Sequence, residues 1–192
     1  MATDAIVRRD VIKELIQLKN IKAMICEKVL FQTEKEYFEI NSLLKVEKIP
    51  TWVNCVFRAT PFFKSLKALL DKDKLIRMRV EGADWGLACN GIHFLDLFSF
   101  LTGCGDFEFT NSRFDQVIPD FKRPESKEFI GEMAGVNSKG HQLVMSCREG
   151  DLDSKKLRGL KTIHIDNLTT RHQITVFPDK VTHKTVTGKS VI

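Results

Sequence analysis

The segment IKAMICEKVLFQ, residues 21–32, decides how the fold is interpreted, because an apolar run ends directly in a glutamate and a lysine. Residues 21–26 are nearly all apolar and are bounded by polar residues, which is typical of a strand buried on both faces of a parallel sheet. A helix is predicted before this strand, capped by Thr3 or Asp4, and another after it, capped by Thr33. The segment is therefore an α-β-α piece.

The neighbouring elements extend this α/β pattern. The first helix, which ends near residue 20, shows apolar residues at helical spacing: Val7, Val11, Leu15 and Leu18, with Ile12 and Ile16 beside them. Residues 51–61 supply the next strand, whose residues 52–58 should lie parallel to residues 21–26. Pro61 then opens a helix at a position where its missing N–H is harmless.

After residue 75 the strands change character. Ile76, Met78 and Val80 alternate with Arg77 and Arg79, which predicts a largely antiparallel sheet with one buried and one polar face. Residues 90–103 form an apolar helix that ends at a glycine, and five further strands are expected at residues 128–136, 141–149, 162–168, 171–178 and 180–187. The predicted fold is a remnant of a parallel Rossmann sheet (residues 1–60) followed by an α+β domain with an open, mainly antiparallel sheet and helices on one face (61–192).

Composition excludes several classes of protein. The 192 residues are 43% hydrophobic, as in an ordinary globular chain, and the net charge of +5 is scattered among acidic residues, which argues against a nucleic-acid partner. The five cysteines are widely spaced and include no CxxC pair, which favours reduced thiols in the cytoplasm. No segment has the apolar length of a signal peptide or a membrane span.

Glu27 and Lys28 stand at the end of the predicted buried strand, where open α/β sheets bind their ligands. A lysine there can donate a hydrogen bond to a substrate oxygen, or transfer a proton if burial lowers its pKa. The alternative is an ordinary surface pair at the start of a loop.

A second cluster lies in residues 84–97. Cys89, Asn90 and Asp96 are four before, three before and three after His93, so all can share one helix face. Histidine is suited to proton transfer near neutral pH, and a carboxylate one turn away could fix its tautomer. The alternative is a core histidine satisfied by backbone and solvent. Residues 103–108 are interpreted as a turn, and the other histidines lack metal-ligand spacing, so no metal site is expected.

The order of these motifs resembles the second half of the glucose-fructose oxidoreductase and inositol dehydrogenase (Gfo/Idh/MocA) family. CEKVLF is similar to the family's Glu-Lys-Pro segment, with Val29 in place of proline, FRATPFFKSLKALL to its Arg-containing strand and following helix, and WGLACNGIHFLDLFSFLTG to its active-site helix. The resemblance covers most of residues 3–110. Cys89 stands where many members carry an aspartate.

The resemblance implies an enzyme, or part of one, that transfers hydride between NAD or NADP and the hydroxyl of a sugar, polyol or nucleotide sugar. It implies that Lys28 and His93 are catalytic. It implies substrate-binding roles for Arg58, Trp85, Asn90 and Asp96, and cofactor-binding roles for Thr3, Glu27 and Lys28. A non-catalytic sugar-binding or oligomerisation module derived from the same fold is the alternative.

Both ends of the sequence are expected to be cuts through a larger protein. The chain opens on a helix without a preceding strand, and the family's glycine-rich first βαβ unit would lie upstream of Met1. GKSVI, residues 188–192, closes the chain in or just after a strand. Weak or absent dinucleotide binding is therefore expected of this chain alone, and a homo-oligomer is expected through the open sheet.

Overall fold

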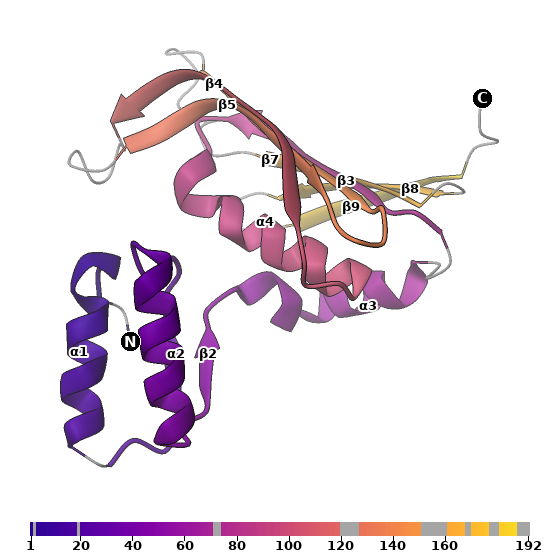
Figure 1. Cartoon of the computed structure of the whole chain (residues 1–192). Helices are drawn as coiled ribbons and strands as arrows, with labels where there is room; N and C mark the ends of the chain where they lie inside the picture. Colours follow the sequence, from indigo (N-terminus) through magenta and orange to yellow (C-terminus); the bar gives the residue numbers. More distant parts are fainter. Residues whose placement is uncertain are drawn as a thin grey trace. The chain divides into compact units, whose positions relative to one another are not determined.

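The computed structural model describes residues 1, 3–18, 20–70, 74–119, 127–150, 161–167, 170–176 and 181–187. The chain divides into two compact units, Met1–Val56 and Phe57–Ile192 (Figure 1). From the sequence, this division was expected after residue 60, whereas the structure has it after Val56. The expected interruption at residues 188–192 lies outside the described part of the chain.

The first unit is an α/β piece. Helices α1 (Ala5–Gln17) and α2 (Glu34–Val46) flank strand β1 (Met24–Cys26), which pairs in parallel with β2 (Thr51–Val53). Asp4 caps α1 by accepting a hydrogen bond from the Ile6 N–H, and Thr33 and Glu36 form a capping box on α2. The predicted parallel pairing is confirmed. The second strand is shorter than expected, however, because residues Val56–Ala59 turn into a 3₁₀ helix, η1.

The buried side of α1 differs from the predicted stripe. Val7 and Leu18 are 48% and 66% exposed, whereas Arg8, Ile12 and Ile16 are buried. The buried set follows an i, i+4, i+8 spacing that lies on one helix face. The predicted apolar face was therefore wrong at Val7 and Leu18. The sequence pattern counted apolar residues alone and so left out Arg8, which the core accepts.

The core of the first unit lies on one face of its short sheet. It is formed by Ile12, Ile16, Met24, Cys26, Phe31 and Ile40. Ile25 and Trp52 are register partners, so their side chains share the other face, and both are exposed. The two helices therefore cover one face of the β1–β2 pair and leave the other to solvent in this chain.

In the second unit, the described residues form a seven-stranded sheet with the order β4-β5-β6-β3-β7-β8-β9. The strands are β3 (Arg77–Ala83), β4 (Glu108–Pro119), β5 (Lys127–Val136), β6 (Gln142–Arg148), β7 (Lys161–Asn167), β8 (Thr170–Val176) and β9 (Val181–Thr187). Among the described strands of this sheet, only β3 and β6 pair in parallel. The predicted mainly antiparallel sheet is thus confirmed.

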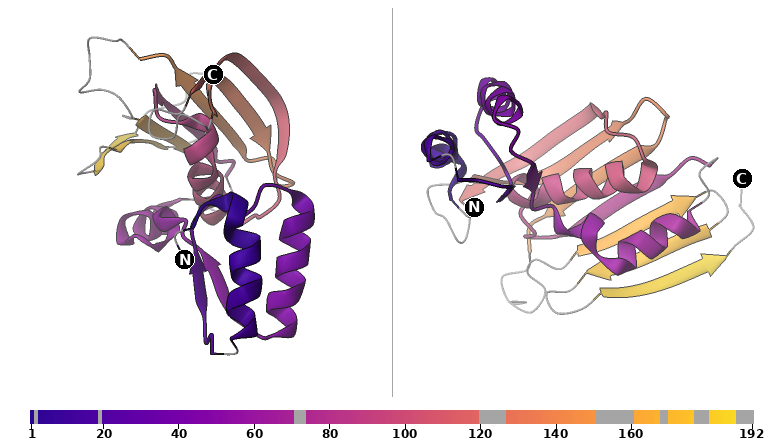
Figure 2. Two further views of the ribbon diagram at one scale, coloured as in Figure 1. Left: turned by 90° about the vertical axis from the view of Figure 1, so that its left-hand side faces the viewer. Right: turned by 90° about the horizontal axis from the view of Figure 1, so that it is seen from below.

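Helices α3 (Pro61–Leu69) and α4 (Leu87–Thr102) lie over one face of this sheet (Figure 2). The core between them and the sheet includes Phe63, Leu66, Met78, Val80, Phe94 and Leu97. Arg77, Arg79 and Glu81 alternate with the buried positions of β3 and point to the opposite face, where Arg79 and Glu81 form an ion pair. That open face is therefore polar along β3, as the alternation predicted.

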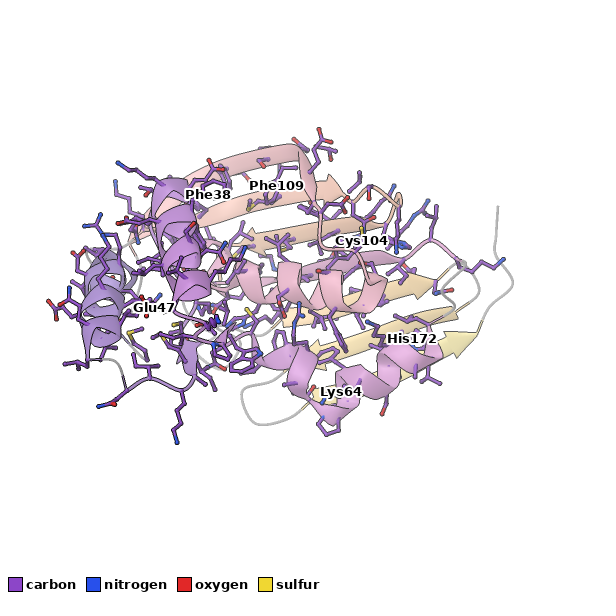
Figure 3. The ribbon with its side chains drawn as sticks, turned by 60° about the horizontal axis from the view of Figure 1, so that its bottom comes forward. Phe38, Glu47, Lys64, Cys104, Phe109 and His172 are labelled. Carbon is purple, nitrogen blue, oxygen red and sulfur yellow. The ribbon has the colours of Figure 1, made fainter. Side chains whose placement is uncertain are left out.

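Strand β4 was absent from the sequence predictions. Its side chains are almost all exposed, including Phe109, which Figure 3 labels at this edge of the sheet. Its pairing with β5 shifts register between Phe109 and Asn111 and again between Phe114 and Gln116. Such irregularities break the alternation of period two by which a strand is identified in a sequence.

Candidate functional site

The candidate residues of the first unit lie just beyond the carboxyl ends of β1 and β2. Glu27 and Lys28 follow β1 directly, and Asn54 follows β2. The Asn54 amide nitrogen donates to Glu27 Oε1 at 2.5 Å, and the Asn54 backbone N–H donates to the Cys26 carbonyl at 2.8 Å. The two strand ends are therefore joined through side chain and backbone, at the edge where open α/β sheets bind ligands.

Lys28 and its surroundings are partly buried. The Lys28 side chain is of intermediate exposure, and the peptide bond between Lys28 and Val29 is cis. Burial raises the pKa of the neighbouring Cys26 thiol, although the charges of the N-terminus and Arg8 oppose this change. Cys26 therefore stays a neutral thiol at neutral pH, and the ionisable side chains offered by this loop are Glu27 and Lys28.

Thr3 lies at the same edge. Its hydroxyl oxygen is buried and has no hydrogen-bond partner among the residues that the structure describes. Its carbonyl accepts a hydrogen bond from the Arg8 guanidinium. An unsatisfied buried hydroxyl close to a glutamate and a lysine is a feature that a polar ligand could complete.

In the second unit, helix α4 carries the remaining candidates and has an unusual N-terminus. Gly86, which precedes the helix, has a φ of 75°, and a Cβ at this position would lie 3.0 Å from both Asn90 Nδ2 and Glu128 Oε1. Glycine is therefore favoured by the backbone conformation, and a larger residue would also displace the Asn90 and Glu128 side chains slightly. Glu128 on β5 accepts hydrogen bonds from the N–H groups of Ala88 (2.8 Å) and Cys89 (3.0 Å). A carboxylate from a distant strand thus caps the helix.

Trp85 and Asn90 are brought together at this helix start. The Asn90 amide donates to the Trp85 carbonyl at 2.6 Å, and the buried Trp85 indole N–H donates to the Ser146 carbonyl at 2.8 Å. The Trp85 ring meets Phe94 edge to face, with centroids 5.3 Å apart. Trp85 therefore serves as part of the core that fixes the start of α4.

His93 is partly buried beside an aromatic cluster. Its ring centroid lies 5.7 Å from that of Phe57, which also contacts Phe63 and Phe94. The His93 Nδ1 atom is buried. The His93 imidazole therefore lies against the Phe57 ring, at the side of a partly buried aromatic cluster.

Asp96 forms an ion pair with Arg58. The Arg58 Nε donates to Asp96 Oδ2 at 2.7 Å, and a terminal guanidinium nitrogen lies 2.5 Å from Oδ1. This two-point pairing is the geometry that an arginine fork makes with a carboxylate. The structure therefore places Asp96 with Arg58, whereas the sequence suggested that Asp96 could orient His93 or the substrate.

The candidates thus form two groups: Thr3, Glu27 and Lys28 belong to the first unit, and Arg58, Trp85, Asn90, His93 and Asp96 to the second. Approach of Lys28 to His93 stays a prediction. Sequence reasoning missed Arg8, Asn54, Phe57 and Glu128. The position of Arg8 one and two turns before Ile12 and Ile16 was a usable signal, whereas nothing local indicates that Glu128 caps a helix forty residues earlier.

In the part of the chain that the structure describes, no group of three or more His, Cys, Asp or Glu residues is placed to hold a metal ion. None of its helices is long and apolar enough to cross a bilayer. The five cysteines, all within the described ranges, are thiols rather than disulfides.

Comparison with known proteins gives similarity of fold. An oxidoreductase from Agrobacterium radiobacter in complex with NAD⁺, L-tartaric acid and magnesium has a TM-score of 0.68 and 17% identity, over 95% of this chain and 58% of that one. The UDP-N-acetylglucosamine 3-dehydrogenase GnnA from Acidithiobacillus ferrooxidans gives 0.68 and 12%, over 98% and 62%. A super-repressor mutant of Gal80p from Saccharomyces cerevisiae gives 0.63 and 12%, over 99% and 60%.

These matches place the chain in a fold class that dehydrogenases share. The chain spans about 60% of the length of these structures. The sequence resemblance to the Gfo/Idh/MocA family therefore has support at the level of fold. No family model matches the chain, and no curated protein matches its sequence.

Proposed function

We propose that this chain is part of an NAD(P)-dependent oxidoreductase, which transfers hydride between the nicotinamide and a hydroxyl of a sugar, polyol or nucleotide sugar in the cytoplasm. The observation that carries the proposal is the position of Lys28, just beyond the carboxyl end of β1. The neighbouring parallel strand β2 ends next to Asn54, which is hydrogen-bonded to Glu27. Ligands of open α/β sheets bind at that edge. The fold similarity to an NAD⁺-complexed oxidoreductase supports the same assignment.

In this proposal the two units supply different groups. Lys28 polarises the substrate oxygen by donating a hydrogen bond, and His93 accepts the hydroxyl proton as hydride leaves the adjacent carbon. Asn90, whose amide carries both a donor and an acceptor group, forms a hydrogen bond with a substrate hydroxyl. The Arg58–Asp96 pair and Trp85 hold the walls of the substrate site.

The residues present at the strand ends fit a dinucleotide in chemical type. Thr3 has a buried hydroxyl available for a hydrogen bond, and Glu27 and Lys28 can accept from and donate to ribose hydroxyls and an amide. When bound, the nicotinamide would supply or accept the hydride. The phosphates would need a glycine-rich loop that leads into a helix N-terminus, and residues 1–192 contain no GxGxxG segment, so this chain would bind the dinucleotide weakly by itself.

A second candidate is a sugar-binding or oligomerisation module without catalysis. It is favoured by Cys89, which stands where the resemblance leads one to expect an aspartate, and by the fold similarity to the super-repressor mutant of Gal80p. Such a module would keep the substrate site and a homo-oligomeric interface, and would need no proton transfer.

The two candidates can be separated with the polypeptide encoded by the complete gene. Nicotinamide absorbance would be followed in the presence of a panel of sugars, polyols and nucleotide sugars, and ligand binding would be measured by calorimetry in parallel. Turnover with any of these substrates supports the oxidoreductase. Binding without turnover across the panel supports the module, and neither binding nor turnover contradicts both.

A further inference from the structure

Arg8 is a buried cation on the inner side of α1. Its side chain is 2% exposed and lies in the same helical row as the core residues Ile12 and Ile16. An arginine is rarely buried to this extent, because removing its charge from water is costly unless hydrogen bonds compensate. The hydrogen-bond partners of Arg8 therefore indicate its structural role.

The Arg8 guanidinium donates its hydrogen bonds to backbone carbonyls. One terminal nitrogen donates to the carbonyls of Val29 and Leu30, the latter at 2.9 Å, and the other donates to the carbonyl of Thr3. Arginine can do this because its donors point outward in a fixed planar fork. A single side chain thus ties together two chain segments, one before α1 and one after β1.

These two segments both lie at the edge of the sheet that carries the candidate site. The N-terminal nitrogen of Met1 donates to the Ile25 carbonyl, and the Glu27 N–H donates to the Met1 carbonyl at 3.1 Å. That pattern is the hydrogen bonding of a parallel strand alongside β1. Thr3 and Val29 therefore both lie just past the carboxyl ends of neighbouring parallel segments. Lys28 precedes Val29 directly and belongs to the same loop.

We infer that Arg8 is a positioning residue, which holds the loop carrying Lys28 against the segment carrying Thr3. A charge-assisted hydrogen bond to each segment fixes their separation, and this separation sets where the Lys28 ammonium stands. A lysine at position 8 would keep the charge but has a single nitrogen, which cannot reach both segments with the same rigid geometry. The importance of this role for catalysis rests on the proposed function, whereas the claim that Arg8 holds the two segments together does not.

The structure provides two backbone amides as reporters. The Glu27 N–H bonds to Met1 across the junction that Arg8 fastens, and the Asn54 N–H bonds to Cys26 on the other side of β1 at 2.8 Å. Both belong to the same small unit, so unfolding of the whole unit exposes both equally. Local loosening of the junction exposes Glu27 alone.

The experiment measures amide hydrogen exchange in the 192-residue chain and in its Arg8→Lys and Arg8→Met variants. Arg9→Met is the matched control, because Arg9 is the next residue on the helix and pairs with Asp10 on the surface. Loss of one charge-assisted hydrogen bond should accelerate exchange at Glu27 about tenfold or more, while Asn54 changes by less than about twofold. The control should leave both amides unchanged.

A second readout follows Lys28 itself. Limited acetylation with peptide mass analysis should show Lys28 reacting severalfold faster in Arg8→Lys, relative to the exposed Lys35. Equal acceleration at Glu27 and Asn54, or no change at Glu27 and Lys28, would show that Arg8 is only a core residue. Failure of both variants to fold would lead to the same conclusion. Absence of oxidoreductase activity in the complete protein would not alter these readouts, so the two proposals fail separately.

Discussion

Replacing Glu128 by alanine should destabilise the second unit by about 2–4 kcal/mol. Glu128 accepts the N–H groups of Ala88 and Cys89 at 2.8 and 3.0 Å, and hydrogen bonds to a charged group contribute about 1.5–3 kcal/mol each. Two such bonds give roughly 3–6 kcal/mol, which includes the attraction between a carboxylate and a helix N-terminus. Glu128 is buried, so the folded wild-type protein bears a desolvation cost for its carboxylate. The alanine variant avoids this cost, which offsets part of the loss in stability.

Urea denaturation followed by circular dichroism would measure the effect. Glu128→Gln keeps one acceptor oxygen without the charge, so it should lose about half as much as the alanine variant. Glu132→Ala, on the same strand at a partly exposed position, is the control and should change the free energy of unfolding by less than about 1 kcal/mol. A Glu128→Ala change below about 0.5 kcal/mol would refute the view that this carboxylate holds the start of α4.

Three further outcomes are expected. Burial, and to a lesser degree the charge of Lys139, lowers the pKa of His141, whose Nδ1 accepts the Ile76 N–H at 3.0 Å. The unfolded chain therefore binds a proton at this histidine more readily, and the stability contributed above the ordinary pKa of about 6.5 is lost as the pH falls. Urea midpoints should show this loss in the wild type, and His141→Asn should not show it. The 192-residue chain should bind NAD(P) weakly or not at all in calorimetry, and micromolar affinity would contradict the need for a separate glycine-rich loop. The complete protein should be a homodimer or a larger oligomer in light scattering, and a monomer at tens of micromolar would contradict this prediction. Because the open face of the sheet is polar along β3, added salt should weaken the association.

Sequence patterns predicted the strands whose two faces differ in polarity. Ile76, Met78 and Val80 alternate with arginines, and the structure buries the former on β3 and exposes Arg77 and Arg79. The parallel β1–β2 pair was likewise predicted, from a short, nearly all-apolar run between polar residues. The expected burial of this strand on both faces was wrong, because Ile25 is exposed. The confirmed features depend on local periodicity, which a single sequence contains.

Other features depend on contacts that a local pattern does not contain. Arg8 is buried because carbonyls from residues 3, 29 and 30 converge on it. Its spacing before Ile12 and Ile16 indicates the helix face it shares with them, but not these carbonyl partners. Glu128 caps a helix forty residues earlier, and Asp96 pairs with Arg58 rather than with a residue of its own helix. The edge strand β4 escaped prediction because register shifts interrupt its alternation. The candidate site was therefore named largely by resemblance, while its supporting contacts required the structure.

Turnover of the complete protein with Lys28 and His93 replaced is the most direct test of the proposed oxidoreductase. Nicotinamide reduction would be measured with the substrate found in the panel, for wild type, Lys28→Ala, His93→Ala and the control Lys35→Ala at an exposed position of α2. Each of the first two variants should lower kcat by about 10²–10⁴ with circular dichroism unchanged, as expected for loss of a general acid or base, and the control should keep wild-type turnover. Wild-type turnover in both Lys28→Ala and His93→Ala would contradict the account.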